Sequence, residues 1–293
     1  MSVVLLNQCE KNESISNVKI PDDNFLNALM ELGIDTDGDG SISYAEAEKV
    51  TALSVNNRGI LDLKGIEEFV NLVSLFCWDN QLTALHISKN VLLKSLGCGG
   101  NQLQQLYVSK NTLLQSLDCE RNQLTSLDIS NNTSLTNLFC SENFLTALDL
   151  TSNTSLYQLI CNYNSLTSLN ISNQPDLIDL SCGGNQLTSL DISNNINLER
   201  LECKSNQLTS LDVSNQPDLK RLSCGGNQLT SLDLTNNSNL DWNDGYEMGC
   251  YLEIEYMPTL EKVCVWAMPF PPSNFILCAE GSPNVYFTMD CSK

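Results

Sequence analysis

The chain has 293 residues and a formal net charge of −20, from 35 acidic and 15 basic residues. Such an acidic chain is unsuited to nucleic acid or an anionic membrane surface, because both attract clusters of Lys and Arg. The sequence also holds no apolar run long enough for a transmembrane helix. We therefore expect neither class of partner and no membrane span.

Residues 1–17 form an N-terminal extension ahead of the first predicted element. Its apolar stretch is too brief for a signal peptide. The letters LLNQC are weakly similar to a lipoprotein cleavage site, in which Cys9 would carry the lipid. A lipid anchor at Cys9 is one expectation for this segment.

Residues 18–49 predict a helical cap that contains a calcium loop. The Pro21-Asp22-Asp23 start, apolar residues at helical spacing and the Gly33 end indicate a short amphipathic helix. Repeat arrays need such a cap, because the first coil otherwise exposes its apolar edge.

The twelve residues that follow, DTDGDGSISYAE, match an EF-hand loop from its first position to its twelfth. Calcium prefers hard oxygen ligands, so the match predicts Ca²⁺ at this loop. No second EF-hand follows, which favours a structural site over a sensor. The alternative is a solvated acidic loop. The expected ligands are Asp35, Asp37, Asp39, the Ser41 carbonyl and Glu46.

Residues 50–239 repeat one phrase every 21 residues, as in LQSLDCERNQLTSLDISNNTS. A fixed period near 20 residues indicates a solenoid, in which each coil covers the next. The segments LxC and LDI alternate inward and outward with the period of a strand. We therefore expect a mostly β solenoid with two short parallel strands per coil, forming two sheets.

A cysteine recurs in every phrase, from Cys77 to Cys224. Eight inward cysteines on stacked parallel strands have parallel Cβ vectors, which is poor geometry for disulfides. We interpret this ladder as reduced thiols that act as small buried hydrophobes. An asparagine three residues after each cysteine should bond backbone groups at the turn.

The phrase resembles bacterial leucine-rich repeats of the 21-residue type LxxLxCxxNxLxxLDLxxN, over roughly residues 50–265. The cap and first coils also look like the N-terminal half of secreted Bacteroidetes surface proteins that join a calcium-loop cap to such repeats. This resemblance implies a secreted or cell-surface protein.

Residues 240–293 break the repeat frame and predict irregular last coils with a C-terminal cap. The stretch MPTLEKVCVW…FPP…GSPNVYFTMDC resembles the end of the same repeat region. That resemblance implies a disulfide between Cys264 and Cys291, and it leaves Cys250 and Cys278 unassigned.

The residues beside each LxC strand vary from coil to coil, whereas the LDI face is a monotonous column of Asp with Ser and Thr. Recognition needs variation, so we expect a monomer that binds a protein or glycan on the Cys-strand face. The alternative is that the aromatic residues pack on flanking segments. Large aromatics and arginines tend to dominate interface energies. The candidate contact residues are Phe76, Trp78, Phe139, Arg200 and Arg221.

Two other classes of function fit the sequence less well. The Ser and Thr columns are similar to flat ice- or mineral-binding ladders, but the charged Asp column interrupts them. A hydrolase would need a placed base or an isolated carboxylate pair. The single histidine, His86, accompanies no nucleophile motif, and the abundant Asp residues belong to repeat columns. We therefore expect a non-enzymatic protein.

Overall fold

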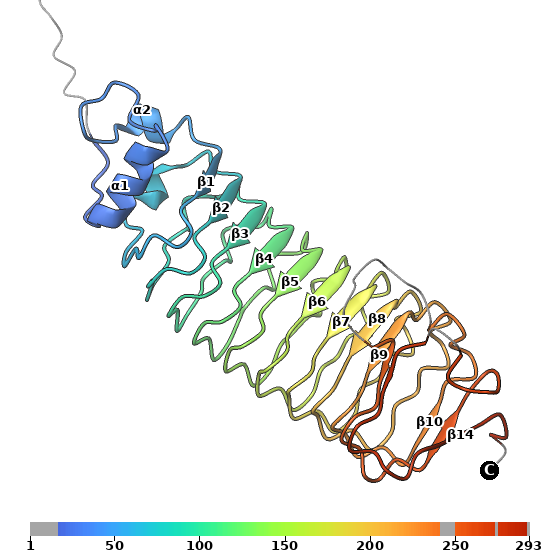
Figure 1. Cartoon of the computed structure of the whole chain (residues 1–293). Helices are drawn as coiled ribbons and strands as arrows, with labels where there is room; N and C mark the ends of the chain where they lie inside the picture. The colour runs from blue at the N-terminus through green and yellow to red at the C-terminus, as the bar shows by residue number, and fades with distance from the viewer. Residues whose placement is uncertain (1–16, 241–249, 273–274, 292–293) are drawn as a thin grey trace, which may run out of the picture.

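A computed structural model describes residues 17–240, 250–272 and 275–291. Over these residues the chain winds into an elongated parallel β-solenoid with a small helical cap at its N-terminal end (Figure 1). The mostly β fold class predicted from the repeats is confirmed. The predictions for Cys9 and for the frame break at 241–249 fall outside the described residues.

The helical cap is fixed to the first coil by Asp22. This residue is the N-cap of α1 (Asp23–Glu31), and its Oδ1 accepts a hydrogen bond from the Phe25 N–H at 2.9 Å. Its Oδ2 accepts from the N–H of Leu61 at 2.8 Å, nearly forty residues further on. The Phe25 ring packs against Phe69 at 6.4 Å between centroids, so the helix lies against the first coils.

One parallel sheet of 11 strands runs the length of the molecule in the order β1 to β9, β11, β13. Neighbouring strands are joined in register at the repeat period, as in the pair Leu75 and Leu96. The strands are β1 (Ala52–Ser54), β2 (Ser74–Phe76), β3 (Ser95–Gly97), β4 (Ser116–Asp118), β5 (Asn137–Phe139), β6 (Gln158–Ile160), β7 (Asp179–Ser181), β8 (Arg200–Glu202), β9 (Arg221–Ser223), β11 (Leu252–Glu253) and β13 (Leu277–Cys278). We call the outward surface of these strands the sheet face.

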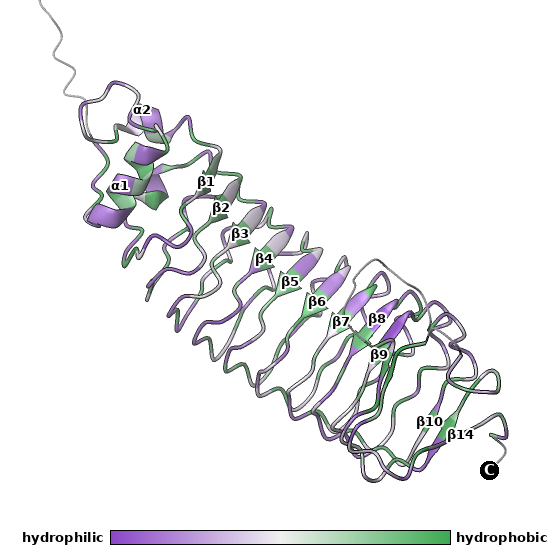
Figure 2. Ribbon diagram, in the orientation of Figure 1, coloured by the Kyte–Doolittle hydropathy of each residue, from purple (hydrophilic) through white to green (hydrophobic). Residues whose placement is uncertain are grey.

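Apolar residues lie on the inside of the coils. Figure 2 shows hydrophobic and hydrophilic segments alternating along the coils, so apolar residues form rows inside the solenoid. The rows merge into one continuous core from the cap to the last coils.

The other elements are short. They are α2 (Tyr44–Ala47), the 3₁₀ turn η1 (Ile66–Glu68) and a second sheet of β10 (Ser231–Asp233), β12 (Lys262–Cys264) and β14 (Tyr286–Thr288).

The prediction of two strands in every coil is wrong. The LDI segments alternate as expected, with Leu127 and Ile129 buried and Asp128 exposed, but most of them form no strand. Their carbonyl groups have other partners: Ile129 O accepts from the Asn132 N–H at 2.9 Å and from Asn153 Nδ2 of the next coil at 3.1 Å. Because side-chain amides occupy these carbonyls, no ladder of paired backbone bonds forms.

These side chains make a second amide column at the last Asn of the repeat phrase, a position to which we assigned no role from the sequence. Each amide nitrogen donates to two carbonyls of earlier coils, and each side chain is at most 1% exposed. Among the described residues, regular strands on this second face begin only at β10, where the column ends, and continue with β12 and β14. The column comprises Asn90, Asn111, Asn132, Asn153, Gln174, Asn195, Gln216 and Asn237.

The predicted asparagine column behind the cysteines is buried as well. Asn143 is 4% exposed; its Nδ2 donates to the carbonyl of Cys119 one coil earlier, and its Oδ1 accepts from the Leu124 N–H, both at 3.0 Å. The same two bonds recur in the neighbouring coils. This column therefore ties each coil to the one before it.

The eight ladder cysteines are free and fully buried. Burial raises the pKa of Cys77 and Cys140 to about 12, because the apolar core disfavours a thiolate. These thiols are therefore neutral and unreactive at ordinary pH. Their placement agrees with the interpretation of the ladder as small buried hydrophobes.

Two disulfides lie in the last coils. Cys264 is bonded to Cys291, the pair that the resemblance implies, and Cys250 is bonded to Cys278; both Cα–Cα distances are 5.8 Å. Cys264 belongs to β12 on the second face, whereas Cys278 belongs to β13 on the sheet face. Each face of the terminal coils therefore carries one covalent cross-link, beyond the last residues of the two amide columns.

Candidate recognition surface and calcium loop

The five candidate contact residues all project from the sheet face, but they do not form one cluster. Phe76 and Trp78 lie on or just after β2, Phe139 ends β5, and Arg200 and Arg221 begin β8 and β9. All five are half-buried. Strands in a sheet are ~4.8 Å apart, so the aromatic pair lies roughly 30 Å from the arginines.

The aromatic end of the face is packed against its neighbour coil. Phe76 and Trp78 stack with ring centroids 4.9 Å apart and an interplanar angle of 29°. The indole lies over Gly97 of the next coil, where an added Cβ would clash with it. The alternative that the aromatic residues pack within the protein therefore applies to Trp78. Its ring covers Gly97 of the sheet and also faces outward.

The middle of the face carries two half-buried carboxylates on and after β4. Burial raises the pKa of both Asp118 and Glu120, and a hydrogen bond with Ser141 lowers that of Glu120 in part. The Asp118 carboxylate interacts with Trp78, and the Glu120 carboxylate interacts with Ser141 of the next coil. This part of the face can accept hydrogen bonds from a ligand.

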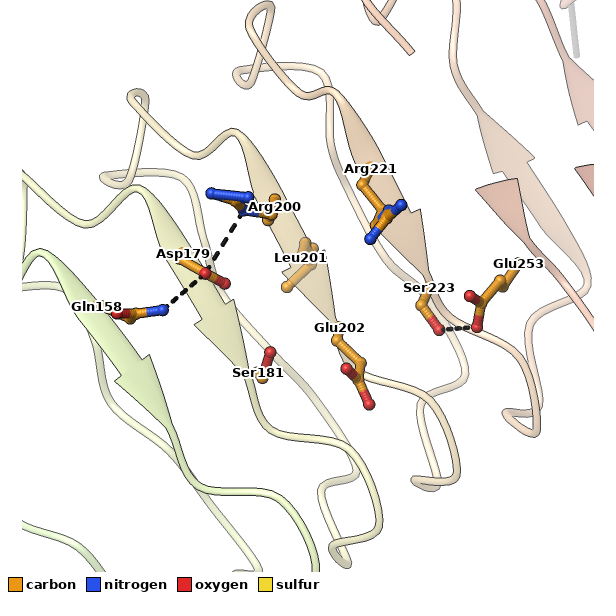
Figure 3. Close-up of a pocket in the computed structure, with 9 residues that line it drawn as sticks. All are labelled: Gln158, Asp179, Ser181, Arg200, Leu201, Glu202, Arg221, Ser223 and Glu253. Atoms are coloured by element: carbon orange, nitrogen blue, oxygen red, sulfur yellow. Dashed lines mark hydrogen bonds and ion pairs between the residues drawn. The ribbon is translucent and has the colours of Figure 1, made fainter. Parts of the chain in front are cut away.

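The charged end of the face surrounds a hollow of about 310 Å³ over β7 to β9 (Figure 3). Asp179 Oδ2 accepts from Gln158 Nε2 at 3.0 Å and lies 3.5 Å from Arg200 Nε. Burial raises the pKa of Asp179, and Arg200 counteracts this in part. The residues that line the hollow are Gln158, Asp179, Ser181, Arg200, Leu201, Glu202, Arg221, Ser223 and Glu253.

Phe144 and Tyr163 are strongly exposed aromatic residues on this side of the molecule that we did not predict, because we considered only residues that flank the Cys strand. Phe144 is 59% exposed and Tyr163 is 56% exposed. They lie four residues after Cys140 and two residues after Cys161, at the turn that follows the strand. A comparison of turn positions between coils would have found them, since Gln or Ser occupies most equivalents of Phe144.

The predicted calcium loop brings three of its five expected ligands together. One carboxylate oxygen from each of Asp35, Asp37 and Asp39 lies within 4.8 Å of the others. Asp35 also accepts from the Gly38 N–H at 2.7 Å and the Gly40 N–H at 2.9 Å, which folds the loop around it. Three convergent carboxylates fit a hard cation such as Ca²⁺.

Glu46, another of the expected ligands, binds other groups. Its Oε1 accepts from the Thr36 N–H and Oγ1 at 2.6 and 2.8 Å. Its Oε2 accepts from the Ser43 N–H and Oγ, both at 2.9 Å, completing a capping box for α2. Ser43 N–H and the other donors lower the pKa of Glu46 to about 2. The sequence missed Thr36 as the residue that closes this loop.

Comparison with solved structures places this architecture among known solenoids. The functional domain of InlJ from Listeria monocytogenes, which includes a cysteine ladder, is 30% identical with a TM-score of 0.80, over 92% of this chain and 64% of that chain. A leucine-rich repeat protein of Leptospira interrogans is 23% identical with a TM-score of 0.64, over 83% and 67%. The chain is a leucine-rich repeat protein with a cysteine ladder.

A further solved structure shares the fold of this leucine-rich repeat protein. Internalin C2 of Listeria monocytogenes is 24% identical with a TM-score of 0.53, over 75% of this chain and 90% of that chain. No protein-family model matches the sequence, and no curated protein is similar to it. The chain spans less than two thirds of the InlJ domain. Within the described residues, no helix has the length and apolar character to cross a bilayer.

The Glu46 hydrogen bonds predict an acid-sensitive cap in this leucine-rich repeat protein. Its folded pKa of about 2 lies below the ordinary value of 4.5, so the stabilisation is complete above about pH 4.5 and is lost as pH falls toward 2. After solvent screening, we expect a loss of about 1 to 2 kcal/mol between pH 6 and pH 3. Amide hydrogen exchange of residues 22–50 at pH 6 and at pH 3 measures this loss of stability.

This prediction is tested by substituting Glu46 and, as the control, the neighbouring Glu48. Glu46→Gln removes the titrating group, so it should destabilise the cap at pH 6 and reduce the pH dependence there. Glu48→Gln changes an exposed side chain and should leave that dependence intact. An unchanged pH dependence in Glu46→Gln would contradict the assignment.

Proposed function

We propose that this chain is a non-enzymatic, secreted or cell-surface protein that recognises another protein through the sheet face. The observation that carries the proposal is the contrast between the two faces. The sheet face changes from stacked aromatics near β2 to a charged hollow near β9. On the second face, the Asp side chains repeat the same local hydrogen bond from coil to coil. In one coil, the Ser130 N–H donates to Asp128 Oδ1 at 3.0 Å.

The sheet face is also rigid before any partner arrives. Its strands are joined in register, and two amide columns tie successive coils together. Eleven strands at ~4.8 Å give a strip of about 50 Å, long enough for an ordinary interface of ~800 Å² per partner. A preformed surface loses little conformational entropy on binding.

The location outside the cell is supported by the two disulfides. Structural disulfides form and persist in oxidising compartments and are rare in a reducing cytosol. Cys250–Cys278 and Cys264–Cys291 each join segments more than 25 residues apart. The eight other described cysteines are buried, which protects them from oxidation in such a compartment.

The test of recognition compares variants of the two faces. The intact chain is screened against an array of extracellular proteins, and the affinity of each hit is measured by biolayer interferometry. Removing an aromatic or arginine contact at the centre of an interface costs about 1 kcal/mol or more, so we expect affinity to fall at least about fivefold for some variants. The sheet-face variants are Phe139→Ser, Phe144→Ser, Arg200→Ala and Arg221→Ala.

The matched control changes the other face. Asp128→Asn, Asp191→Asn and Asp212→Asn lie outside the sheet face and should leave the affinity unchanged. If these three abolish binding and the sheet-face variants do not, the recognition face is the monotonous one and the proposal fails.

We further propose that the cap binds one structural Ca²⁺ through Asp35, Asp37, Asp39 and the Ser41 carbonyl. The convergence of the three carboxylates supports it. The Asp39 N–H lowers the pKa of Asp37, but desolvation and the nearby carboxylates of Asp39 and Glu46 outweigh it and raise that pKa overall. A cation between these groups would relieve that repulsion.

The calcium proposal predicts one binding event and a higher melting temperature, because Ca²⁺ would bind the folded state alone. Isothermal titration calorimetry measures the stoichiometry. Asp37→Asn should abolish the heat of binding, whereas Asp62→Asn, an exposed acidic residue outside the loop, should keep it. Glu46→Gln separates two arrangements: lost binding means that Glu46 leaves Thr36 and Ser43 to bind the ion, and retained binding means that it stays the cap.

A further inference from the structure

A second hollow, of about 450 Å³, lies at the turn that follows β9. It adjoins the charged hollow, because Ser223 and Glu253 line both. Its lining includes the pair Gly225 and Gly226, after which we call it the glycine hollow. Tyr256 of the next coil also lines it and is 61% exposed.

At the same turn of other coils, an aromatic ring of the chain itself lies over a glycine. The ring of Tyr163 lies over Gly184 of the next coil, where an added Cβ would be 2.6 Å from Tyr163 Cδ1. Tyr256 lies over Gly281 in the same way, and the corresponding distance is 2.7 Å. A glycine at this position therefore accommodates a flat aromatic ring from the coil before it.

At Gly226 the corresponding place is open. The preceding coil supplies Ser205, whose φ of 54° matches the 53° of Tyr163. The N–H of Ser205 donates to Gly225 O at 2.8 Å, as the N–H of Tyr163 does to the equivalent glycine. The three atoms nearest to an added Cβ at Gly226 all belong to Ser205, and the closest is 3.2 Å away. The backbone is thus the same, but a small side chain stands where the other coils have a ring.

The other lining groups suit an aromatic side chain that carries a polar donor. The carboxylates of Glu253 and Glu255 can accept a hydrogen bond from a phenol O–H or an indole N–H. The exposed Tyr256 ring offers an aromatic contact, and Lys204 offers a cation to a ring face. Lys204 Nζ already lies 3.2 Å from Glu202 Oε1, so its charge does not require an anionic ligand.

We propose that the glycine hollow binds an aromatic side chain, Tyr or Trp, of a protein partner. The inference rests on the proposed recognition function and names the chemistry of one contact. Large aromatic side chains that fill a pocket are frequent anchors of protein interfaces. The rings that the chain places over Gly184 and Gly281 are flat, which favours an aromatic ring over a puckered sugar ring.

The experiment observes the hollow through glycine signals. In a sample labelled with ¹³C and ¹⁵N at glycine alone, an HNCO spectrum detects only glycines that follow another glycine. The sequence therefore gives three signals, from Gly100, Gly184 and Gly226. The signals of Gly184 and Gly226 are assigned with the variants Tyr163→Ser and Ser205→Gly, which change the residue next to each.

The probe is N-acetyl-tyrosinamide, titrated to millimolar concentrations against the full chain. We expect the Gly226 signal to shift saturably. The Gly100 and Gly184 signals should stay nearly constant, because Asp79 and Tyr163 already occupy the space over these glycines.

The variant Ser205→Tyr fills the hollow from within. It places a ring over Gly226 as Tyr163 does over Gly184, and a tyrosine fits there because Tyr163 and Tyr256 both have a φ of 53°. We expect the probe to bind at least about tenfold more weakly to this variant, with thermal unfolding unchanged. Ser205→Gly, which keeps the place open, should retain the affinity within about twofold.

Other probes identify the chemistry of the ligand. N-acetyl-leucinamide should produce no saturable shift of Gly226, and equal binding of the leucine and tyrosine derivatives would overturn the aromatic assignment. Saturation by methyl β-glucoside but not by the tyrosine derivative would overturn the protein assignment in favour of a glycan. Equal shifts of the three glycines, no saturation, or undiminished binding to Ser205→Tyr would remove the site.

Loss of the site leaves the recognition function standing, because the affinity of protein hits for the sheet-face variants tests that function separately. None of those variants changes a residue that lines the glycine hollow. Conversely, a saturable Gly226 site combined with hits that ignore every sheet-face variant would retain the site and reject the proposed function.

Discussion

Asn143→Ala should lower the free energy of unfolding by about 3 to 5 kcal/mol, the largest effect we expect from a single side chain. The Leu124 N–H donates to Asn143 Oδ1 at 3.0 Å and has no other acceptor among the described residues. The substitution therefore leaves this buried N–H unsatisfied. It also removes the donor to the carbonyls of Cys119 and Cys140. A buried, unsatisfied backbone group costs about 1 to 3 kcal/mol, and the lost side-chain volume adds to that.

Urea denaturation followed by circular dichroism measures this loss. The matched control is Asn131→Ala, because Asn131 is an exposed residue of the preceding coil and its change should stay within about 0.5 kcal/mol. A loss below about 1 kcal/mol in Asn143→Ala would show that the coils do not depend on the amide column.

Removing the Cys264–Cys291 disulfide should cost about 3 to 4 kcal/mol, the second largest effect. The two cysteines are 27 residues apart, and closing a loop of that length restricts the unfolded chain by this amount. The cross-link lies beyond Asn227 and Asn237, where the amide columns end. The loss should therefore appear as local opening of the last coils rather than as unfolding of the whole solenoid.

Hydrogen exchange of the double variant Cys264→Ser/Cys291→Ser measures where the opening occurs. Exchange should accelerate over residues 250–291 and stay unchanged over the coils from β3 to β6. The control is Cys140→Ala, which removes a free ladder thiol and should cost about 1 kcal/mol without opening the last coils. Faster exchange throughout the chain in the double variant would contradict local capping.

The solenoid could be predicted from the sequence because its information is local and repeated. A cysteine at an invariant interval of 21 residues sets the number of residues in one coil, and the alternation around it decides which side chains are buried. The cap was predictable for the same reason, since Asp22 and the residues after it form a standard helix start.

The second face could not be predicted in this way. The segment around Asp128 has the pattern of a strand, yet a strand also requires partner backbones, and these carbonyls bond to amides 21 to 24 residues later. Only the stacking of coils brings Asn153 next to Ile129. The sequence pattern was therefore correct about burial and wrong about hydrogen bonding.

The same distinction between local pattern and contacts between coils applies to the candidate sites. The sequence by itself determined which residues face outward, including Phe76, Arg200 and Arg221, because orientation follows from the period of two along a strand. Only the tertiary structure decided that Thr36 holds Glu46 and that Trp78 covers Gly97. Those outcomes depend on distances between different coils or across a loop, which no local pattern specifies.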